Sequence, residues 1–291
     1  VYATWWKLYI QRWNNLLPEV PLYSNQYFDL YNAKIENFVT SPYWSPASAI
    51  IAATIKAGES NSVILGSSTD LSGAFRSSSW GKSSPASSDL DIENLTSGYS
   101  TLQTDMNGAF VWNELAIAEE PTAVKNEDGT LTYTIKLRND MKFSDGSAIT
   151  AKNYVASTLA NSTAVAVAAG GTGNSGMTLV GYDAFKAYEG EGDKVYFEGI
   201  KLIDDYTFSA TIEAEYLPYF YDLSYASFGA ESIKYWLGEG YDVADDGEGA
   251  YIAGLTKDAV AAQLEYARFN AGEDVVSAGP YNLVEYDKAA L

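Results

Sequence analysis

The side chains that most enzymes use for catalysis are largely missing from this sequence of 291 residues, which has no cysteine and no histidine. Their absence excludes disulfides and thiol nucleophiles, and it removes the commonest general base and the usual zinc ligand. Two adjacent carboxylate pairs remain, Asp204-Asp205 and Asp245-Asp246, which could serve a glycosidase. Because neighbouring residues of a strand point to opposite faces, both pairs are better explained as turns. We therefore expect no enzyme, no catalytic residue and no cofactor.

Two other features could bind something. Residues 245–249, DDGEG, are acidic enough to suggest calcium, but they lack the alternating oxygen ligands and the closing glutamate of an EF-hand, so we expect no metal site. Trp80-Gly81 lies within the Ser- and Gly-rich residues 67–88, which we interpret as a long loop. A large aromatic side chain in such a loop either plugs onto the core or belongs to a binding surface. Both interpretations stay open on the residues alone.

The charge of the chain excludes one class of partner. It has 38 acidic and 18 basic residues and a formal net charge of −20, so it should repel nucleic acid and anionic membranes. Excess Asp and Glu also keep a protein dispersed, and this is the simpler explanation of the charge. A hydrophobic share of 47% is enough for a sizeable core, in one large domain or two ordinary ones.

Helices are expected where apolar residues recur at helical spacing. Trp5, Tyr9, Trp13 and Leu16 share one face of an amphipathic helix over residues 2–17, which Pro18 ends. Asp89 or Ser88 should cap a further helix over residues 89–99, and Thr150 one over residues 150–159. Asn153 stands where an acidic residue would complete a capping box, so the reciprocal hydrogen bond should be weaker. We also expect helices over residues 181–188, 218–223, 232–237 and 257–270.

Strands are expected where apolar residues alternate or form short runs between turns. The chain should form hairpins at residues 105–108 and 204–205, and a half-buried strand over residues 131–137 that follows the turn Asp128-Gly129. Short strands are expected at residues 19–23, 27–31, 62–66 and 279–284. Residues 160–177, rich in Ala and Gly, should be flexible.

Several stretches resemble the oligopeptide- and dipeptide-binding family of ABC importers, whose members are extracellular solute-binding proteins. Residues 128–146, DGTLTYTIKLRNDMKFSDG, with Thr150-Ala151-Lys152, resemble its strand–turn–helix signature. Residues 203–207, 217–221 and 278–281 resemble later segments of the family, with Ala278 in place of a threonine. Residues 13–23, WNNLLPEVPLY, resemble the penultimate helix and strand of the family, although here they come first.

The resemblance implies an α/β protein of mixed α+β character, with a periplasmic-binding-protein-like main lobe. A mixed β-sheet flanked by helices would form this lobe, together with a small inserted α+β domain. The main domain would comprise residues 1–98 and 200–291, and the inserted domain residues 99–199. Residues 1–40 would supply the closing elements and bury their aromatic face against the sheet, and residues 41–61 would be a join. The chain would then hold only the first of two lobes, in permuted order. Tandem copies in a longer precursor are the simplest origin of that order, and a natural or engineered permutant is the other.

The implied function is ligand capture for an ABC importer, most simply for oligopeptides, which such proteins bind through main-chain hydrogen bonds. Its partners would be a peptide or other small molecule, a membrane permease and the missing second lobe, with no nucleic acid. By resemblance, the first lobe would contact the ligand at Ser79, Trp80 and Gly81. The protein would be extracellular, on the cell surface or periplasmic, with the signal and a lipoprotein anchor outside this excerpt. Alternatives are the same fold binding sugars, and a surface domain that binds nothing.

Overall fold

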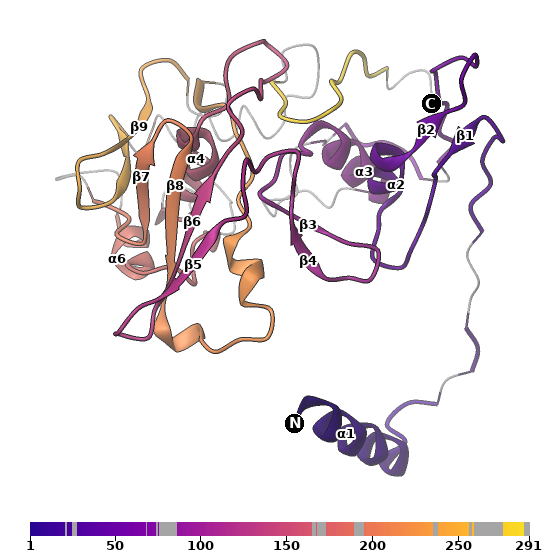
Figure 1. Ribbon diagram of the computed structural model, residues 1–291, viewed down its shortest axis with the longest axis horizontal. Helices are drawn as coiled ribbons and strands as arrows, with labels where there is room; N and C mark the ends of the chain where they lie inside the picture. Colours follow the sequence, from indigo (N-terminus) through magenta and orange to yellow (C-terminus); the bar gives the residue numbers. More distant parts are fainter. Residues whose placement is uncertain are drawn as a thin grey trace.

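The structure is a computed structural model with a mixed α and β body and one helix that stands apart from it (Figure 1). It describes residues 1–20, 22–24, 28–67, 69–73, 75, 86–164, 167, 173–188, 195–234, 238–255, 258 and 276–287. All but residue 258 of the predicted helix at residues 257–270 lies outside this part, and so do residues 165, 166 and 168–172 of the Ala- and Gly-rich stretch and the end of the helix expected at residues 232–237.

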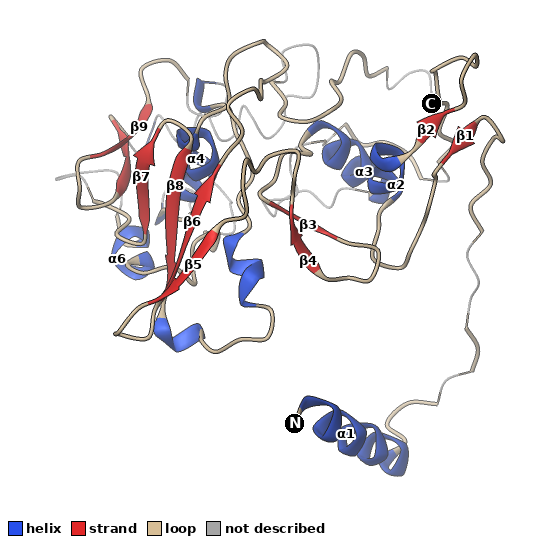
Figure 2. Cartoon of the chain, viewed as in Figure 1, coloured by secondary structure: helices blue, strands red, loops and turns tan. Residues whose placement is uncertain are grey.

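A four-stranded antiparallel sheet forms the centre of the body, in the order β5-β6-β8-β7 (Figure 2). Its strands are β5 Thr122–Lys125, β6 Leu131–Lys136, β7 Ile200–Asp204 and β8 Thr207–Ile212. Both predicted turns are confirmed, since Asp128-Gly129 leads into β6 and Asp204-Asp205 joins β7 to β8. The described pairings are all antiparallel, so the prediction of a mixed sheet is wrong for this part. Hairpins build most of the sheet, and a hairpin can pair its strands only in opposite directions.

The core lies between this sheet and helix α4, Ala151–Asn161. Ile135 of β6, Phe208 of β8 and Tyr154 of α4 are fully buried, and the rings of Tyr154 and Phe208 stack at 6.1 Å. A second hairpin, β9 Asp242–Asp245 and β10 Ala250–Ala253, packs on α4 and beside β7. Short helix α6, Tyr182–Lys186, closes the far end, where Phe185 stacks on Phe197 at 4.8 Å.

The start of α4 differs in one detail from the sequence-based expectation. Thr150 is the N-cap residue as predicted, and Asn153 Oδ1 accepts the Thr150 N–H at 2.8 Å. The Asn153 amide nitrogen also donates to the main-chain oxygen of Glu231 at 3.1 Å. The reciprocal bond is therefore fully formed, because an amide can both close the cap and bind a second segment.

A smaller layer of helices and hairpins lies beside the sheet (Figure 1). Helix α2, Pro46–Ala52, packs on helix α3, Ser87–Thr96. The predicted hairpin at residues 105–108 is confirmed as β3 Leu102–Thr104 and β4 Phe110–Trp112. A further pair of strands, β1 Ile35–Glu36 and β2 Thr54–Ile55, precedes and follows α2 in the sequence. Residues 41–61, predicted as a join, thus contain a helix whose Ala47 and Ala49 are fully buried.

Two short 3₁₀ helices complete the described elements, η2 Ala214–Tyr216 and η3 Asp222–Ala226. The second follows Pro218, in the region where a helix was expected. The hydroxyl of Thr101 donates to the oxygen of Ala226 at 2.7 Å and accepts the N–H of Phe228 at 2.9 Å. Because Thr101 is fully buried, these two hydrogen bonds fix the segment after η3 to the segment before β3.

The N-terminal helix is present, but its predicted docking against the sheet is wrong. Helix α1, Tyr2–Leu16, has no buried residue and stands apart from the body (Figure 1). The aromatic rings of the helix contact one another along its length. Within the described residues, the one ring contact between α1 and the body joins Tyr2 to Phe220 at 5.8 Å. The face therefore runs through Tyr2, Trp6, Tyr9 and Trp13 rather than through Trp5 and Leu16. Helical periodicity identifies the helix, but it cannot say whether a partner surface is within reach.

Some predicted strands are not formed. The described residues of 19–23 and 27–31, and all of 62–66 and 279–284, have no strand pairing. Residues 62–66 are extended and exposed, and no described strand pairs with them. Ala278 accepts the N–H of Tyr99 at 3.3 Å, and the segment that follows it crosses the end of α3. A domain boundary at residue 199 stays a prediction, and it would cut the central sheet between β6 and β8.

Candidate functional site

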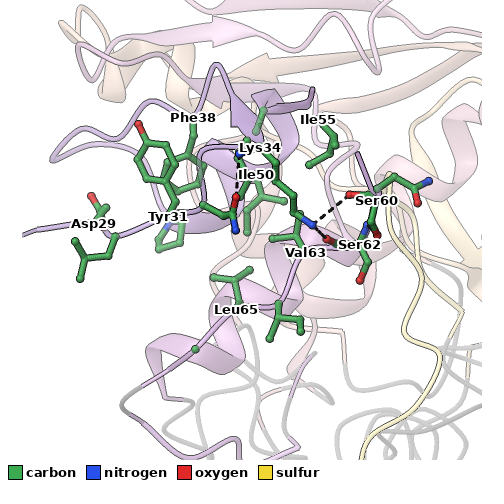
Figure 3. A pocket seen from close by; sticks show the side chains of 18 of the residues that line it. Asp29, Tyr31, Lys34, Phe38, Ile50, Ile55, Ser60, Ser62, Val63 and Leu65 are labelled. Carbon is green, nitrogen blue, oxygen red and sulfur yellow. Dashed lines mark hydrogen bonds between the residues drawn. The ribbon is translucent and has the colours of Figure 1, made fainter. Parts of the chain in front are cut away.

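The site residues expected from the sequence, Ser79, Trp80 and Gly81, lie outside the described residues. The candidate site in the described part is instead a groove with a cavity volume of about 700 Å³ (Figure 3). Three chain segments line it, residues 28–38, 46–55 and 60–66, together with Tyr281. We refer to this feature as the groove.

Local hydrogen bonds hold the first two segments in place. The Asn32 side chain accepts the N–H of Lys34 at 3.0 Å, which turns the chain into strand β1. Strand β1 pairs with β2, placing Ile35 opposite Ile55, and the N–H of Lys56 donates to the oxygen of Lys34 at 2.8 Å. Ser45 caps α2 by accepting the N–H of Ser48, which directs Ile50 to the groove.

The walls of the groove are mainly apolar. Ile50 and Ile55 line it beside Val63 and Leu65 (Figure 3). Val63 and Leu65 come from residues 60–66, which we refer to as the extended segment. The rings of Tyr31 and Phe38 lie 4.8 Å apart at an angle of 46° and form the opposite end. Such a surface favours apolar side chains of a ligand, since their burial removes apolar area from water.

The extended segment offers main-chain groups as well as side chains. No hydrogen bond of the main chain of residues 63–66 is formed within the part of the chain that the structure describes. Ile64 is 95% exposed, so water reaches this segment freely. An exposed extended segment with open N–H and C=O groups can accept a further strand.

Among the described residues, two charged side chains line the groove, Lys34 and Asp29. Lys34 Nζ donates to the main-chain oxygens of Ser60 at 3.2 Å and Ser62 at 2.6 Å, which ties the extended segment to β1. Asp29 accepts the hydroxyl of Thr40 at 2.8 Å. Behind the groove, burial raises the pKa of Asp91 on α3, and a hydrogen bond from the backbone of Ala47 opposes that rise.

The two acidic pairs considered as catalytic carboxylates, Asp204-Asp205 and Asp245-Asp246, form hydrogen bonds that stabilise the fold. Asp204 accepts the N–H of Tyr206, and this bond lowers the pKa of its carboxyl. Asp245, at the end of β9, accepts the N–H groups of Leu202 on β7 and of Gly247 in the turn that follows β9, both at 2.8 Å. Within the described residues there is no group of three or more acidic side chains placed to hold a metal ion.

Comparison with protein families identifies the class. Residues 114–290 match the model described as bacterial extracellular solute-binding proteins, family 5, middle. The chain therefore belongs to family 5 of the bacterial extracellular solute-binding proteins. Proteins of this family are solute-binding components and not enzymes, which excludes the glycosidase hypothesis.

Several solved structures are similar to part of the chain. Listeria monocytogenes OppA bound to peptide is 23% identical, with a TM-score of 0.41, covering 61% of this chain and 35% of that one. Bacillus subtilis AppA in complex with a nonapeptide is 20% identical, with a TM-score of 0.42, covering 72% and 32%. Haemophilus influenzae OppA in complex with RPPGFSPFR is 16% identical, with a TM-score of 0.40, covering 60% and 34%. The matched part thus spans about a third of the length of these proteins.

No curated protein sequence matches the chain. Among the described helices, none combines the length and apolar character that crossing a membrane requires.

Sequence reasoning missed the groove, although part of its signal was available. Ser45-Pro46 followed by Ser48 is a helix start, with an N-cap serine and proline in the first turn, inside the stretch expected to be a join. The approach of residues 60–66 to Lys34 has no local signature, because it joins segments 26 and 28 residues apart.

Proposed function

We propose that this chain is part of the ligand-capture component of an ABC importer and that its ligand is an oligopeptide. Membership of family 5 supports the capture role. The observation that carries the choice of a peptide is the open main chain of residues 63–66 beside an apolar groove. Every peptide has the same backbone, so strand addition there would accept varied sequences.

The same fold binding sugars is the alternative. Sugar sites combine flat aromatic platforms with many hydrogen-bonding side chains. Aliphatic side chains such as Ile50, Ile55 and Val63 form much of the groove, and its rings Tyr31 and Phe38 are tilted against each other. These features favour a peptide with apolar side chains over a sugar.

The order of the parts belongs to the same proposal. Residues 13–23 resemble the closing end of the family and residues from 62 onward its first lobe, so we infer that the chain carries one lobe in permuted order, with helix α1 not docked on the body. The packing of α2 on α3 supports the view that residues 41–61 belong to the body. The permease and a second lobe are the proposed partners, and an extracellular location follows from the class.

The test is calorimetric titration of the 291-residue chain with a pool of apolar tri- to pentapeptides, and separately with oligosaccharides. Because one lobe buries a ligand only on one side, we expect weak peptide binding, with a dissociation constant on the order of 1 mM, and no sugar binding. Binding of sugars but not of peptides would contradict the proposal. A pool of acetylated, amidated peptides should still bind, because the strand pairing uses the backbone.

A further inference from the structure

Helix α1 has an aromatic face that the body leaves uncovered. The rings of this face contact one another along the helix, in the order Tyr2, Trp6, Tyr9 and Trp13. No residue of α1 is buried, and Trp6 and Tyr9 are 51% and 52% exposed. The ring of Phe220, which contacts Tyr2, is itself 76% exposed, so this contact covers little of the face. The aromatic face is therefore open to a partner outside the chain.

The charge of α1 is opposite in sign to that of the rest of the chain. Residues 1–18 contain Lys7 and Arg12 but no Asp or Glu, so all 38 acidic residues lie beyond this helix. Lys7 and Gln11, four residues apart, lie on the side of the helix opposite the aromatic face. Arg12 lies seven residues after Trp5, at the border of the two sides, where its stem can cover apolar surface while its charge stays in water. This arrangement fits a partner with an apolar interior and an anionic surface.

We propose that α1 lies on the surface of a lipid bilayer that contains anionic lipids, with its aromatic face in the headgroup layer. Tyr and Trp side chains favour this layer, because each has an apolar ring and a polar edge. The cations of Lys7 and Arg12 lie among the phosphate groups, and the attraction adds to the burial of the rings. The proposal concerns where the protein is held, and it does not depend on which ligand the protein captures.

The length and the two sides of α1 decide how it meets the bilayer. Its 15 residues rise about 22 Å along the axis, less than the hydrocarbon thickness of about 30 Å. A spanning orientation would also place Lys7 and Gln11 in hydrocarbon, which is costly for charged and polar groups. The helix therefore lies in the plane of the surface.

The chain between α1 and the body lets the acidic body stay clear of the membrane. Residues 18–33 form no helix or strand in their described part, which is exposed throughout (Figure 1). A chain of this length can reach about 50 Å, several times the screening length of about 8 Å in physiological salt. The net charge of −20 thus repels the body from anionic lipids without acting at full strength on α1.

The test of the charge is flotation of the 291-residue chain with vesicles of equimolar phosphatidylcholine and phosphatidylglycerol, and with vesicles of phosphatidylcholine alone. We expect binding to the mixed vesicles to be at least about fivefold tighter, since each cation near an anionic surface contributes about that factor. Lys7→Gln should weaken binding to the mixed vesicles about fivefold. Lys56→Gln, the same change at an exposed site of the body, should leave binding unchanged.

The test of the aromatic face uses two further variants in the same assay. Trp6→Gln combined with Tyr9→Gln removes apolar area but keeps good helix formers, so it should weaken binding to both kinds of vesicle by at least about tenfold. Tyr23→Gln, at an aromatic residue outside α1 that is 79% exposed, is the control and should bind as the unchanged chain does. Since α1 has no buried residue, the double variant should keep the fold of the body.

The outcomes decide between a membrane and other partners. No binding of the unchanged chain to the mixed vesicles overturns the proposal, and so does equal binding of the double variant. If the chain failed to bind vesicles but sedimented as a dimer that the double variant does not form, the face would belong to a contact between two copies. Peptide titration involves no lipid, so failure of the vesicle test leaves the proposed peptide binding unaffected.

Discussion

The phenol of Tyr154 donates a hydrogen bond of 2.6 Å to the main-chain oxygen of Tyr99 and thereby fixes helix α4 to the segment between α3 and β3. Tyr154 is fully buried and lies between the central sheet and the smaller layer that carries α2 and the groove. Burial raises the pKa of its phenol, with a smaller contribution from Tyr99, so it stays a neutral donor at any ordinary pH. The bond is thus a fixed link between the part of the chain that matches the family and the layer that bears the groove.

Replacing Tyr154 with phenylalanine tests this link. The change keeps the ring that stacks on Phe208 and removes only the donor, leaving the oxygen of Tyr99 without its partner. We expect the free energy of unfolding to fall by about 1–3 kcal/mol, measured by urea denaturation. Tyr23→Phe, at a site 79% exposed, is the control and should change nothing. Equal stability of the two variants would mean that the link carries no net energy.

Gly279 is a second point where the two parts meet. A Cβ atom there would lie 2.7 Å from the nitrogen of Gly98 and 2.8 Å from the oxygen of Thr96, and neither main-chain atom can move away easily. Gly279→Ala should therefore destabilise the protein by about 1–3 kcal/mol, as overpacking of a core does. Gly66→Ala, where a Cβ atom meets nothing within 4 Å, is the matched control for thermal denaturation. Similar melting temperatures for both variants would contradict the close approach.

The sequence predicts the hairpins well because their signals are local. Asp105 to Gly108 and Asp128-Gly129 are turns that short-range chemistry alone explains, and each is present. The hairpin of β9 and β10 was not predicted, although Asp245-Asp246 was interpreted as a turn, because no alternation of apolar residues marks its short strands; the Asp245 carboxylate binds the N–H of Leu202 on β7. Residues 62–66 have the composition of a strand, but no described strand pairs with them, and composition alone does not show whether a neighbouring strand is present.

The site was harder to predict than the fold. Ser79 to Gly81 lie outside the described residues, so that expectation stays a prediction. The groove depends on three segments packing together, and the hydrogen bonds of Lys34 depend on oxygens contributed by Ser60 and Ser62. A lone lysine in a sequence carries no sign of such neighbours.

The acidic turns predict how stability depends on pH. Asp105 accepts N–H groups from Ala109 and Asn107, which hold the pKa of its carboxyl below the usual 3.8; a bond from Thr130 does the same to Asp128. A carboxylate with a lowered pKa stabilises the fold above about pH 3.8, and this contribution is lost as the pH falls through the folded-state pKa. The denaturation midpoint should therefore drop as the pH falls from about 3.8 through the lowered folded-state pKa values. Asp105→Asn should make that drop shallower, whereas Glu59→Gln, at an exposed site, should leave it unchanged.

The last prediction concerns helix α1, whose aromatic side chains are exposed to solvent, whereas the body has a buried core. No residue of α1 is buried, so removing residues 1–17 should change the free energy of unfolding by less than about 0.5 kcal/mol. The shortened chain should also associate less in light scattering, since it loses the exposed rings of Trp5 and Trp6. Ala49→Leu in α2 is the control, and overpacking this fully buried site should cost about 1–3 kcal/mol. If the shortened chain aggregated or lost its cooperative transition instead, α1 would have to cover part of the body in solution, as its resemblance to a closing element of the family implies.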